Sequence, residues 1–190
     1  MGRQVRRTDP ARRGVLKFTA TELAGAFVID LEPIADERGF FARTWCGDEL
    51  AQHGLVANLA QASLSSNRAR GTLRGMHYAV EPHPEAKIVS CVRGAIFDVI
   101  VDLRSGPTQC KWFGVELSAA NHRMLYIPVG FAHGFLTLDD DTVVSYMISE
   151  RYDASCARGV RYSDPAFEIQ WPSSPTTISQ RDATYPDFVR

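Results

Sequence analysis

Short runs of β-branched and aromatic residues, separated by turn residues, recur along most of the chain and constrain its fold more than any other feature. Two of these runs, Ile88–Val92 and Ala95–Leu103, lie close together in the sequence. Arg93-Gly94 between them predicts a hairpin turn. Many short strands with few helices are typical of a β-sandwich or a β-barrel. Further strands are predicted at Gly25–Leu31, Phe113–Leu117, Met124–Ile127, Gly134–Leu138 and Val143–Ser149.

Alternation within the second run supports the strand prediction. One face carries Phe97, Val99, Val101 and Leu103, and the other carries Asp98, Ile100 and Asp102. Two short helices are predicted, at Gly47–His53 and Thr19–Leu23, and the Pro/Ser-rich stretch Trp171–Thr177 predicts a loop before a short C-terminal segment.

Length and charge limit the classes of protein that fit. The 190 residues predict a single domain over residues 15–190, preceded by an arginine-rich arm, residues 1–14, that we expect to be flexible. That arm is either a solvated tail or a phosphate-binding arm. The net charge of −1 gives no basic field for nucleic acid, and no apolar run approaches the roughly 18 residues of a membrane span.

Four cysteines lie far apart in the sequence. With no C-x-x-C pair, they do not predict a zinc ribbon or a redox motif. No apolar stretch follows the basic start, so we expect no secretory signal and free thiols in the cytoplasm. The cysteines are Cys46, Cys91, Cys110 and Cys156.

The densest cluster of residues that could take part in catalysis is Gly71–Tyr78. Strand alternation predicts that Arg74 and Met76 lie opposite Leu73, Gly75 and His77. A partly desolvated histidine facing the interior of a barrel is a candidate general base. The alternative is a structural histidine with its hydrogen bonds satisfied.

Three more residues are candidates. Lys87 starts a strand and could place an ammonium beside a developing oxyanion, although a surface lysine is the alternative. His133 lies among small residues after a turn, either beside a cavity or bonded to a carboxylate or carbonyl. Tyr146 is either a proton donor or a core tyrosine with its hydroxyl at the rim.

Metal and phosphate binding make different demands. A metal-binding barrel of this kind shows two histidines one residue apart followed by a carboxylate, and neither His77 nor His133 has such a neighbour, so no metal is expected. Phosphate needs cations or backbone N–H groups. Arg74 and Arg38 are candidates, and Arg38 follows an acidic pair that offers an ordinary surface ion pair instead.

The motifs together resemble the dTDP-4-dehydrorhamnose 3,5-epimerase family. The L-R-G-x-H and G-F-A-H-G-F stretches are specific, and the resemblance extends over about residues 20–185. It implies an all-β, cupin-type jelly-roll barrel with a few short helices, and a homodimer. The matching stretches are Asp36–Phe41, Gly71–Tyr78, Lys87–Arg104, Trp112–Leu117, Ile127–Phe135, Tyr146–Tyr152, Arg158–Asp164, Ile169–Pro172 and Ile178–Asp182.

The resemblance also implies roles for individual residues. His77 matches the catalytic base, Asp182 the carboxylate that orients it, and Tyr146 the acid on the other side of the sugar ring. Lys87 matches the cation beside the C4 oxygen, and His133 a further active-site histidine. Arg38 and Arg74 match residues that hold the diphosphate or the sugar.

Several positions depart from the family pattern where its members contact substrate. Arg43 stands where a glutamate is usual, Ala157 replaces another glutamate, and Arg181 replaces a lysine. Ala62 and Leu64 stand where a Q-x-N pattern is usual, with Gln61 one residue away as the alternative alignment. Because buried polar groups give most substrate discrimination, these changes predict an altered nucleotide or sugar.

The resulting hypothesis is an isomerase, without cofactor, that inverts C3, C5 or both in a nucleoside-diphosphate 4-keto-6-deoxysugar. The expected partners are a nucleotide-linked 4-keto sugar and a second copy of the chain. We expect no binding to nucleic acid or to a membrane. Two alternatives stay open. One is a ketoisomerase on the same barrel, and the other is a non-catalytic cupin that binds a sugar nucleotide. A long apolar stretch, Ala26–Ile29, supports the dimer because it could cross to a partner.

Overall fold

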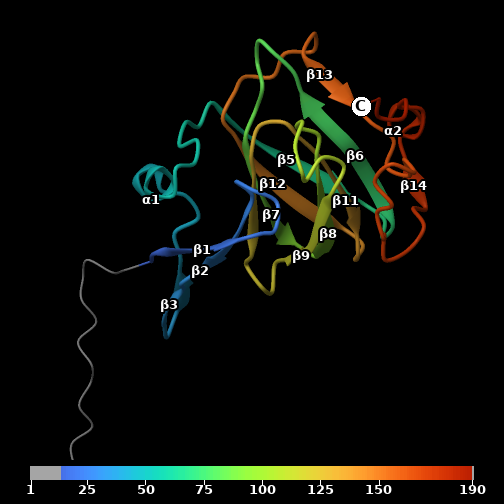
Figure 1. The fold of residues 1–190 in the computed structure, drawn as a ribbon. Coiled ribbons are helices and arrows are strands. Elements are labelled where there is room, and N and C mark those ends of the chain that lie inside the picture. Colours follow the sequence, from blue (N-terminus) through green and yellow to red (C-terminus); the bar gives the residue numbers. More distant parts are fainter. Residues whose placement is uncertain (1–13, 190) are drawn as a thin grey trace, which may run out of the picture.

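The computed structural model describes residues 14–189, which form two β-sheets packed face to face (Figure 1). The first sheet has the strand order β1-β2-β10-β7-β12-β5, and the second has the order β13-β6-β11-β8-β9, with β14 parallel to β6. The prediction of an all-β jelly roll is confirmed. Apart from Gly14, the predicted arm lies outside the described residues.

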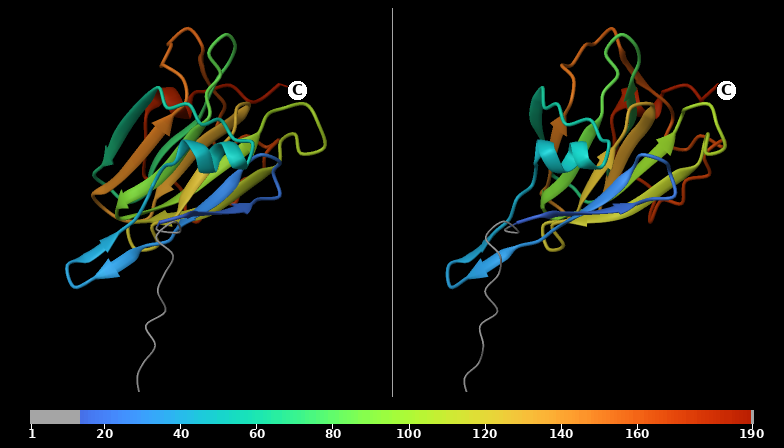
Figure 2. Two further views of the ribbon diagram at one scale, coloured as in Figure 1. Left: turned by 90° about the vertical axis from the view of Figure 1, so that its left-hand side faces the viewer. Right: turned by 60° about the vertical axis from the view of Figure 1, so that its left-hand side comes forward.

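The strands of the first sheet are β1 (Leu16–Ala20), β2 (Phe27–Leu31), β5 (Gln61–Asn67), β7 (Lys87–Arg93), β10 (Met124–Ile127) and β12 (Thr142–Ile148). Those of the second are β6 (Thr72–Ala79), β8 (Ala95–Asp102), β9 (Trp112–Ser118), β11 (Phe131–Thr137), β13 (Ala157–Gly159) and β14 (Thr177–Ile178). A separate hairpin, β3 (Ile34–Asp36) and β4 (Gly39–Phe41), projects from the body (Figure 2). The helices are α1 (Gly47–Gln52) and α2 (Gln180–Ala183).

Two local predictions are wrong. Arg93-Gly94 is not a hairpin turn, because β7 pairs with β10 and β12 in the first sheet while β8 pairs with β11 and β9 in the second. Gly94 has a φ of +72°, and a Cβ there would lie 2.6 Å from Oγ1 of Thr142, so this corner needs glycine as the chain crosses between sheets. Thr19–Leu23 is not a helix, since Thr19 pairs with Val28 in β1 and β2.

The helix predicted at Gly47–His53 is confirmed as α1, and the five further strands predicted from sequence correspond to β2, β9, β10, β11 and β12. The sequence did not predict β5 (Gln61–Asn67), because five of its seven residues are polar. Pairing along β12 holds this segment extended despite its poor strand composition.

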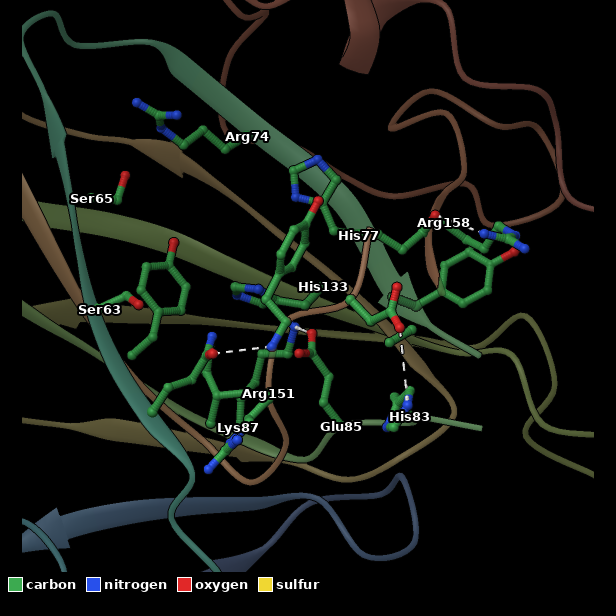
Figure 3. A pocket seen from close by; sticks show the side chains of 18 of the residues that line it. Ser63, Ser65, Arg74, His77, His83, Glu85, Lys87, His133, Arg151 and Arg158 are labelled. Atoms are coloured by element: carbon green, nitrogen blue, oxygen red, sulfur yellow. Dashed lines mark hydrogen bonds and ion pairs between the residues drawn. The ribbon is translucent and has the colours of Figure 1, made fainter. Parts of the chain in front are cut away.

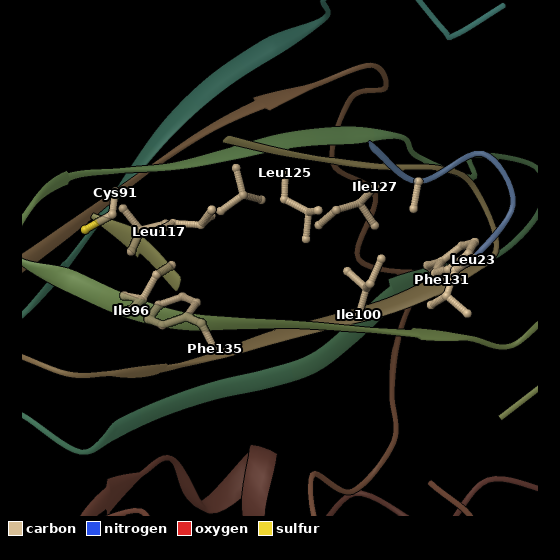
Figure 4. Close-up of a cluster of buried hydrophobic side chains, with 12 residues drawn as sticks. Leu23, Cys91, Ile96, Ile100, Leu117, Leu125, Ile127, Phe131 and Phe135 are labelled. Atoms are coloured by element: carbon tan, nitrogen blue, oxygen red, sulfur yellow. The ribbon is translucent and has the colours of Figure 1, made fainter. Parts of the chain in front are cut away.

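Three apolar clusters hold the layers together. The central one lies between the sheets and includes Ile100, Leu125 and Phe135 (Figure 4). A second covers the outer face of the first sheet with Leu50 of α1, and a third covers the second sheet with residues of the C-terminal segment such as Phe167. The predicted alternation along β8 is confirmed, because Ile100 packs in the central cluster and Val99 and Val101 in the outer one.

Candidate active site

A cavity of about 320 Å³ opens between the two sheets, next to the central cluster (Figure 3). Strands β5, β7 and β12 of the first sheet and β6 and β11 of the second contribute to its wall. Phe135 and Tyr146 belong both to this wall and to the core packing. The cavity is therefore built on the rigid part of the sandwich.

His77 on β6 and Asp182 on α2 form a bonded pair at this cavity. Nε2 of His77 lies 2.9 Å from Oδ1 of Asp182, and Oδ2 of the same carboxylate accepts a hydrogen bond from the backbone N–H of Gly75 at 3.1 Å. Ser179 caps α2 by accepting the Asp182 backbone N–H at 3.1 Å, which fixes the helix that carries the carboxylate. Asp182 is buried, while the side chain of His77 is 45% exposed to the cavity.

This pairing determines the tautomer of His77. A carboxylate only accepts hydrogen bonds, so Nε2 carries the proton and Nδ1 is left as a free base. Burial raises the pKa of Asp182, but the hydrogen bonds from His77 and Gly75 outweigh it and hold that pKa below its ordinary value. The carboxylate thus stays ionised and favours the imidazolium that forms when Nδ1 accepts a proton.

A bulge in β6 brings Arg74 and His77 into the same cavity. On β11, His133 pairs with His77 and Phe135 pairs with Arg74, so the register shifts between them. The prediction that Arg74 and His77 point to opposite faces is therefore wrong. A Cβ on Gly75 would lie 2.5 Å from Cα of Gly134, so the two strands approach closely at the bulge.

Tyr146 on β12 enters the cavity from the opposite sheet. Burial, followed by the nearby Asp98 carboxylate, raises the pKa of Tyr146 far above its usual value, although Arg74 and Ser65 lower it in part. The phenol is therefore held protonated, which suits a proton donor and not a general base.

His133, in the cavity wall, forms a second imidazole–carboxylate pair. Its Nε2 lies 2.8 Å from Oδ1 of Asp98, and both side chains are buried. The ring of His133 stands nearly perpendicular to that of Tyr146, at 77°, with 6.2 Å between the centroids. Both alternatives predicted for His133 therefore apply, because it is bonded to a carboxylate and also lines the cavity.

Lys87 begins β7 with its side chain buried in the cavity wall, not on the surface. Its Nζ donates a hydrogen bond of 2.6 Å to Oε1 of Glu85. Such a desolvated ammonium can stabilise an oxyanion far more strongly than one in water.

Arginines surround the other part of the cavity. Arg74 is fixed by a 2.7 Å hydrogen bond from its Nε to Oδ1 of Asn67, and Arg181 lies over the ring of Tyr185. Arg151 and Arg158 also line the wall. This concentration of guanidinium groups suits an anionic ligand with several oxygens, such as a diphosphate.

Arg38 and Arg43 do not line this cavity. Arg38 is 81% exposed at the turn of the projecting hairpin and pairs with Asp36. Arg43 pairs with Glu49 of α1. Within one copy of the chain, both arginines are engaged elsewhere.

Comparison with known proteins places the chain in a family. Residues 20–189 match the family model described as dTDP-4-dehydrorhamnose 3,5-epimerase. The chain belongs to this family. Its cupin-type fold and its class, an isomerase that acts as an epimerase, follow from that membership and from the sheet order described above.

Individual members are similar over most of their length. A dTDP-4-dehydrorhamnose 3,5-epimerase of Sinorhizobium fredii is 41% identical over 90% of this chain and 89% of its own. A dTDP-4-dehydrorhamnose 3-epimerase of Streptomyces niveus is 40% identical over 84% of this chain and 78% of its own. The crystal structure of the Bacillus anthracis 3,5-epimerase, with TDP and PPi bound, has a TM-score of 0.87 at 38% identity and covers 92% of this chain and 100% of its own.

Some of the positions that depart from the pattern of the epimerase family lie in the cavity wall. Gln61 and Ser63 on β5 line the cavity, whereas Leu64 is 70% exposed on the other face. Gln61 therefore presents its side chain to this wall, as the alternative alignment predicts. Ala157 also lines the cavity, with a side chain shorter than the glutamate that the family pattern predicts there.

Sequence reasoning missed Glu85 and Asp98 as site residues. Asp98 had a usable signal, because alternation along β8 places its carboxylate on the same inward face as Ile100. A charge on that face requires a partner, which is His133. Glu85 precedes Lys87 by two residues, the spacing that puts both side chains on one side of an extended segment.

Proposed function

We propose that this epimerase inverts C3, or both C3 and C5, of a nucleoside-diphosphate 4-keto-6-deoxysugar by proton transfer. One observation carries the proposal. An oriented imidazole, His77, and a protonated phenol, Tyr146, come from opposite sheets into one cavity that also holds the ammonium of Lys87. Inversion at carbon requires an acid and a base on opposite sides of the ring.

The proton transfers balance without a redox step or a cofactor. Nδ1 of His77 takes the proton from the carbon beside the ketone, and the electron pair of that C–H bond passes into an enolate. The ammonium of Lys87 stabilises the enolate oxygen. Tyr146 then gives its proton to the opposite face of the carbon, and solvent removes the proton from His77 and returns one to the phenolate.

The arginines would bind the nucleotide end of the substrate. Arg74 and Arg181 are the main candidates, and the Bacillus anthracis relative supports this class of ligand because it binds TDP and PPi. Gln61, Ser63 and Ala157 would influence which sugar or base fits. The 3-epimerase of Streptomyces niveus shows that single-centre members exist in the family.

Solvent deuterium incorporation tests the proposal. The chain is incubated in D₂O with dTDP-, UDP-, GDP- and CDP-linked 4-keto-6-deoxyglucose, and deuterium at C3 and C5 is followed by NMR. We expect incorporation with inversion at C3 or at both carbons, and its loss in His77→Asn. A 3-keto product would indicate a ketoisomerase instead, and binding without exchange would indicate a non-catalytic cupin.

The proposal extends to a homodimer in the cytoplasm. Phe40 and Phe41 are 53% and 72% exposed on the projecting hairpin, and Val92 is 54% exposed on β7. Exposed apolar groups of this size are typical of a surface that a partner covers. In a dimer, the hairpin would also offer Arg38 to the second copy, consistent with a substrate-binding role outside its own cavity. Light scattering that shows a monomer at micromolar concentration would contradict the dimer.

A further inference from the structure

Glu85 is a half-buried carboxylate in the cavity wall with no part in the proton transfers described above. Its Oε1 accepts the 2.6 Å hydrogen bond from Lys87, and the side chain is 17% exposed. Among the described residues, it is the one carboxylate within 4 Å of the Lys87 ammonium. A carboxylate in a cavity for an anionic substrate weakens substrate binding. Its presence beside Lys87 therefore calls for a functional explanation.

The backbone between the two residues is locked. The N–H of Ala86 donates to Oγ of Ser149 at 2.8 Å, and the N–H of Ser149 donates to the carbonyl of Ala86 at 2.9 Å. Lys87 itself is held between two neighbouring strands, opposite Ile127 and Ile148. The Cα positions of Glu85 and Lys87 are therefore fixed, and only their side chains can move.

A lysine side chain has four rotatable methylene links and is poorly ordered by itself. An oxyanion, by contrast, requires its donor within about 2.7–3.1 Å of where the charge develops. One hydrogen bond to Glu85 uses one of the three ammonium N–H groups and leaves two for the substrate. The ion pair also allows the ammonium to be buried before the substrate arrives.

We propose that Glu85 is the positioning residue that holds the Lys87 ammonium against the ketone oxygen. This inference rests on the proposed role of Lys87 in stabilising the enolate. Two effects of Glu85 oppose each other, because its negative charge weakens the field at the ketone while its hydrogen bond places the ammonium. At 2.6 Å the placement is tight, and misplacing a catalytic group by about 1 Å costs on the order of 10²-fold in rate.

The first test compares kcat and KM of Glu85→Gln, Glu85→Asp and the wild type. We expect Glu85→Gln to lose about 10²-fold in kcat, with KM no higher than the wild-type value because the arginines are untouched and a repelling charge is removed. Glu85→Asp retains the charge and should recover part of the loss. The matched control is Glu116→Gln, which makes the same change on an exposed residue of β9 and should leave kcat unchanged.

The second test is chemical rescue. Propylammonium replaces the atoms removed in Lys87→Ala, and we expect it to restore activity there but not in Lys87→Ala combined with Glu85→Gln. A merely structural role for Glu85 would not produce this dependence. Circular dichroism confirms that each variant is folded.

The outcomes separate the inference from the proposed function. Full or raised kcat in Glu85→Gln, with loss in Lys87→Ala, overturns the positioning role alone. Rescue that is equal with and without Glu85 overturns it as well. Full activity in Lys87→Ala removes the proposed role of the lysine, and the positioning role with it.

Discussion

Replacing Asp182 by Asn isolates the contribution of the carboxylate that orients His77. The wild-type carboxylate accepts two N–H groups, from His77 Nε2 at 2.9 Å and from Gly75 at 3.1 Å. An asparagine offers one acceptor oxygen and one donor NH₂ in their place. Because the Gly75 N–H can only donate, the asparagine oxygen turns toward it and the NH₂ toward His77.

That orientation changes the tautomer of His77. Nε2 becomes the acceptor, so the proton moves to Nδ1, the nitrogen that must act as the base. The opposite orientation keeps the active tautomer but sets two donors against each other at the buried Gly75 N–H, at a cost of about 1–3 kcal/mol. At about 1.36 kcal/mol per tenfold, the active orientation is populated roughly one time in 5 to one time in 150.

We therefore expect the rate of deuterium incorporation at C3 to fall by at least that factor, and by up to about 10⁴-fold if loss of the ionised carboxylate also disfavours the imidazolium. NMR in D₂O measures the rate at saturating substrate. Asp187→Asn is the control, since it removes a surface carboxylate that pairs with Arg161. If Asp182→Asn exchanges C3 as fast as the wild type, the tautomer argument is wrong.

Three further predictions follow from the same contacts. Tyr146→Phe should form inverted product about 10²–10⁴-fold more slowly yet still incorporate deuterium without inversion, because His77 can exchange its proton and return it to the same face. Tyr162→Phe, outside the cavity, is the control. Loss of both exchange and inversion in Tyr146→Phe would argue against a separate acid and base. Gly75→Ala should lower the free energy of unfolding in urea by roughly 2–6 kcal/mol, from backbone strain and the 2.5 Å approach to Gly134. Gly39→Ala has the same φ of +129° with nothing within 4 Å, so it should show the strain alone, and equal losses would contradict the steric argument. Burial raises the pKa of Asp102, but hydrogen bonds from Arg104 and Thr108 outweigh this effect, so the net pKa is lowered. The stabilising effect of the carboxylate is therefore complete above about pH 4 and is lost as the pH falls toward the folded-state pKa. In Asp102→Asn, the free energy of unfolding should vary less with pH over this acid range.

The sequence predicted the strands with β-branched residues and several residues of the cavity wall, because these depend on local patterns. His77, Lys87 and Tyr146 lie on predicted strands, His133 lies one residue before one, and all four line the cavity. What local patterns cannot provide is pairing. The corner at Gly94 and the bulge at Gly75 depend on contacts with Thr142 and Gly134, which are distant in sequence.

Asp182 shows the same limit at the site itself. It is 105 residues from His77, on a helix of four residues, and no periodicity predicts that the two meet. Its role came from resemblance to the family alone. Asp98 and Glu85 were missed for the opposite reason, since each has a local signal that only becomes informative once the facing strand is known to bring a histidine or a cavity next to it.

The residues proposed to carry the proton transfers and those proposed to influence the choice of substrate lie on different kinds of strand. His77, Lys87, His133 and Tyr146 lie on β6, β7, β11 and β12, each of which is paired with a strand on both sides. Gln61 and Ser63 lie on β5, which ends the first sheet and has one neighbour, and Ala157 lies on the short edge strand β13. A substitution on an edge strand disturbs fewer ladder hydrogen bonds than one on an inner strand. Substrate preference can therefore diverge on β5 and β13 while the proposed acid and base, held by inner strands of opposite sheets, keep their geometry.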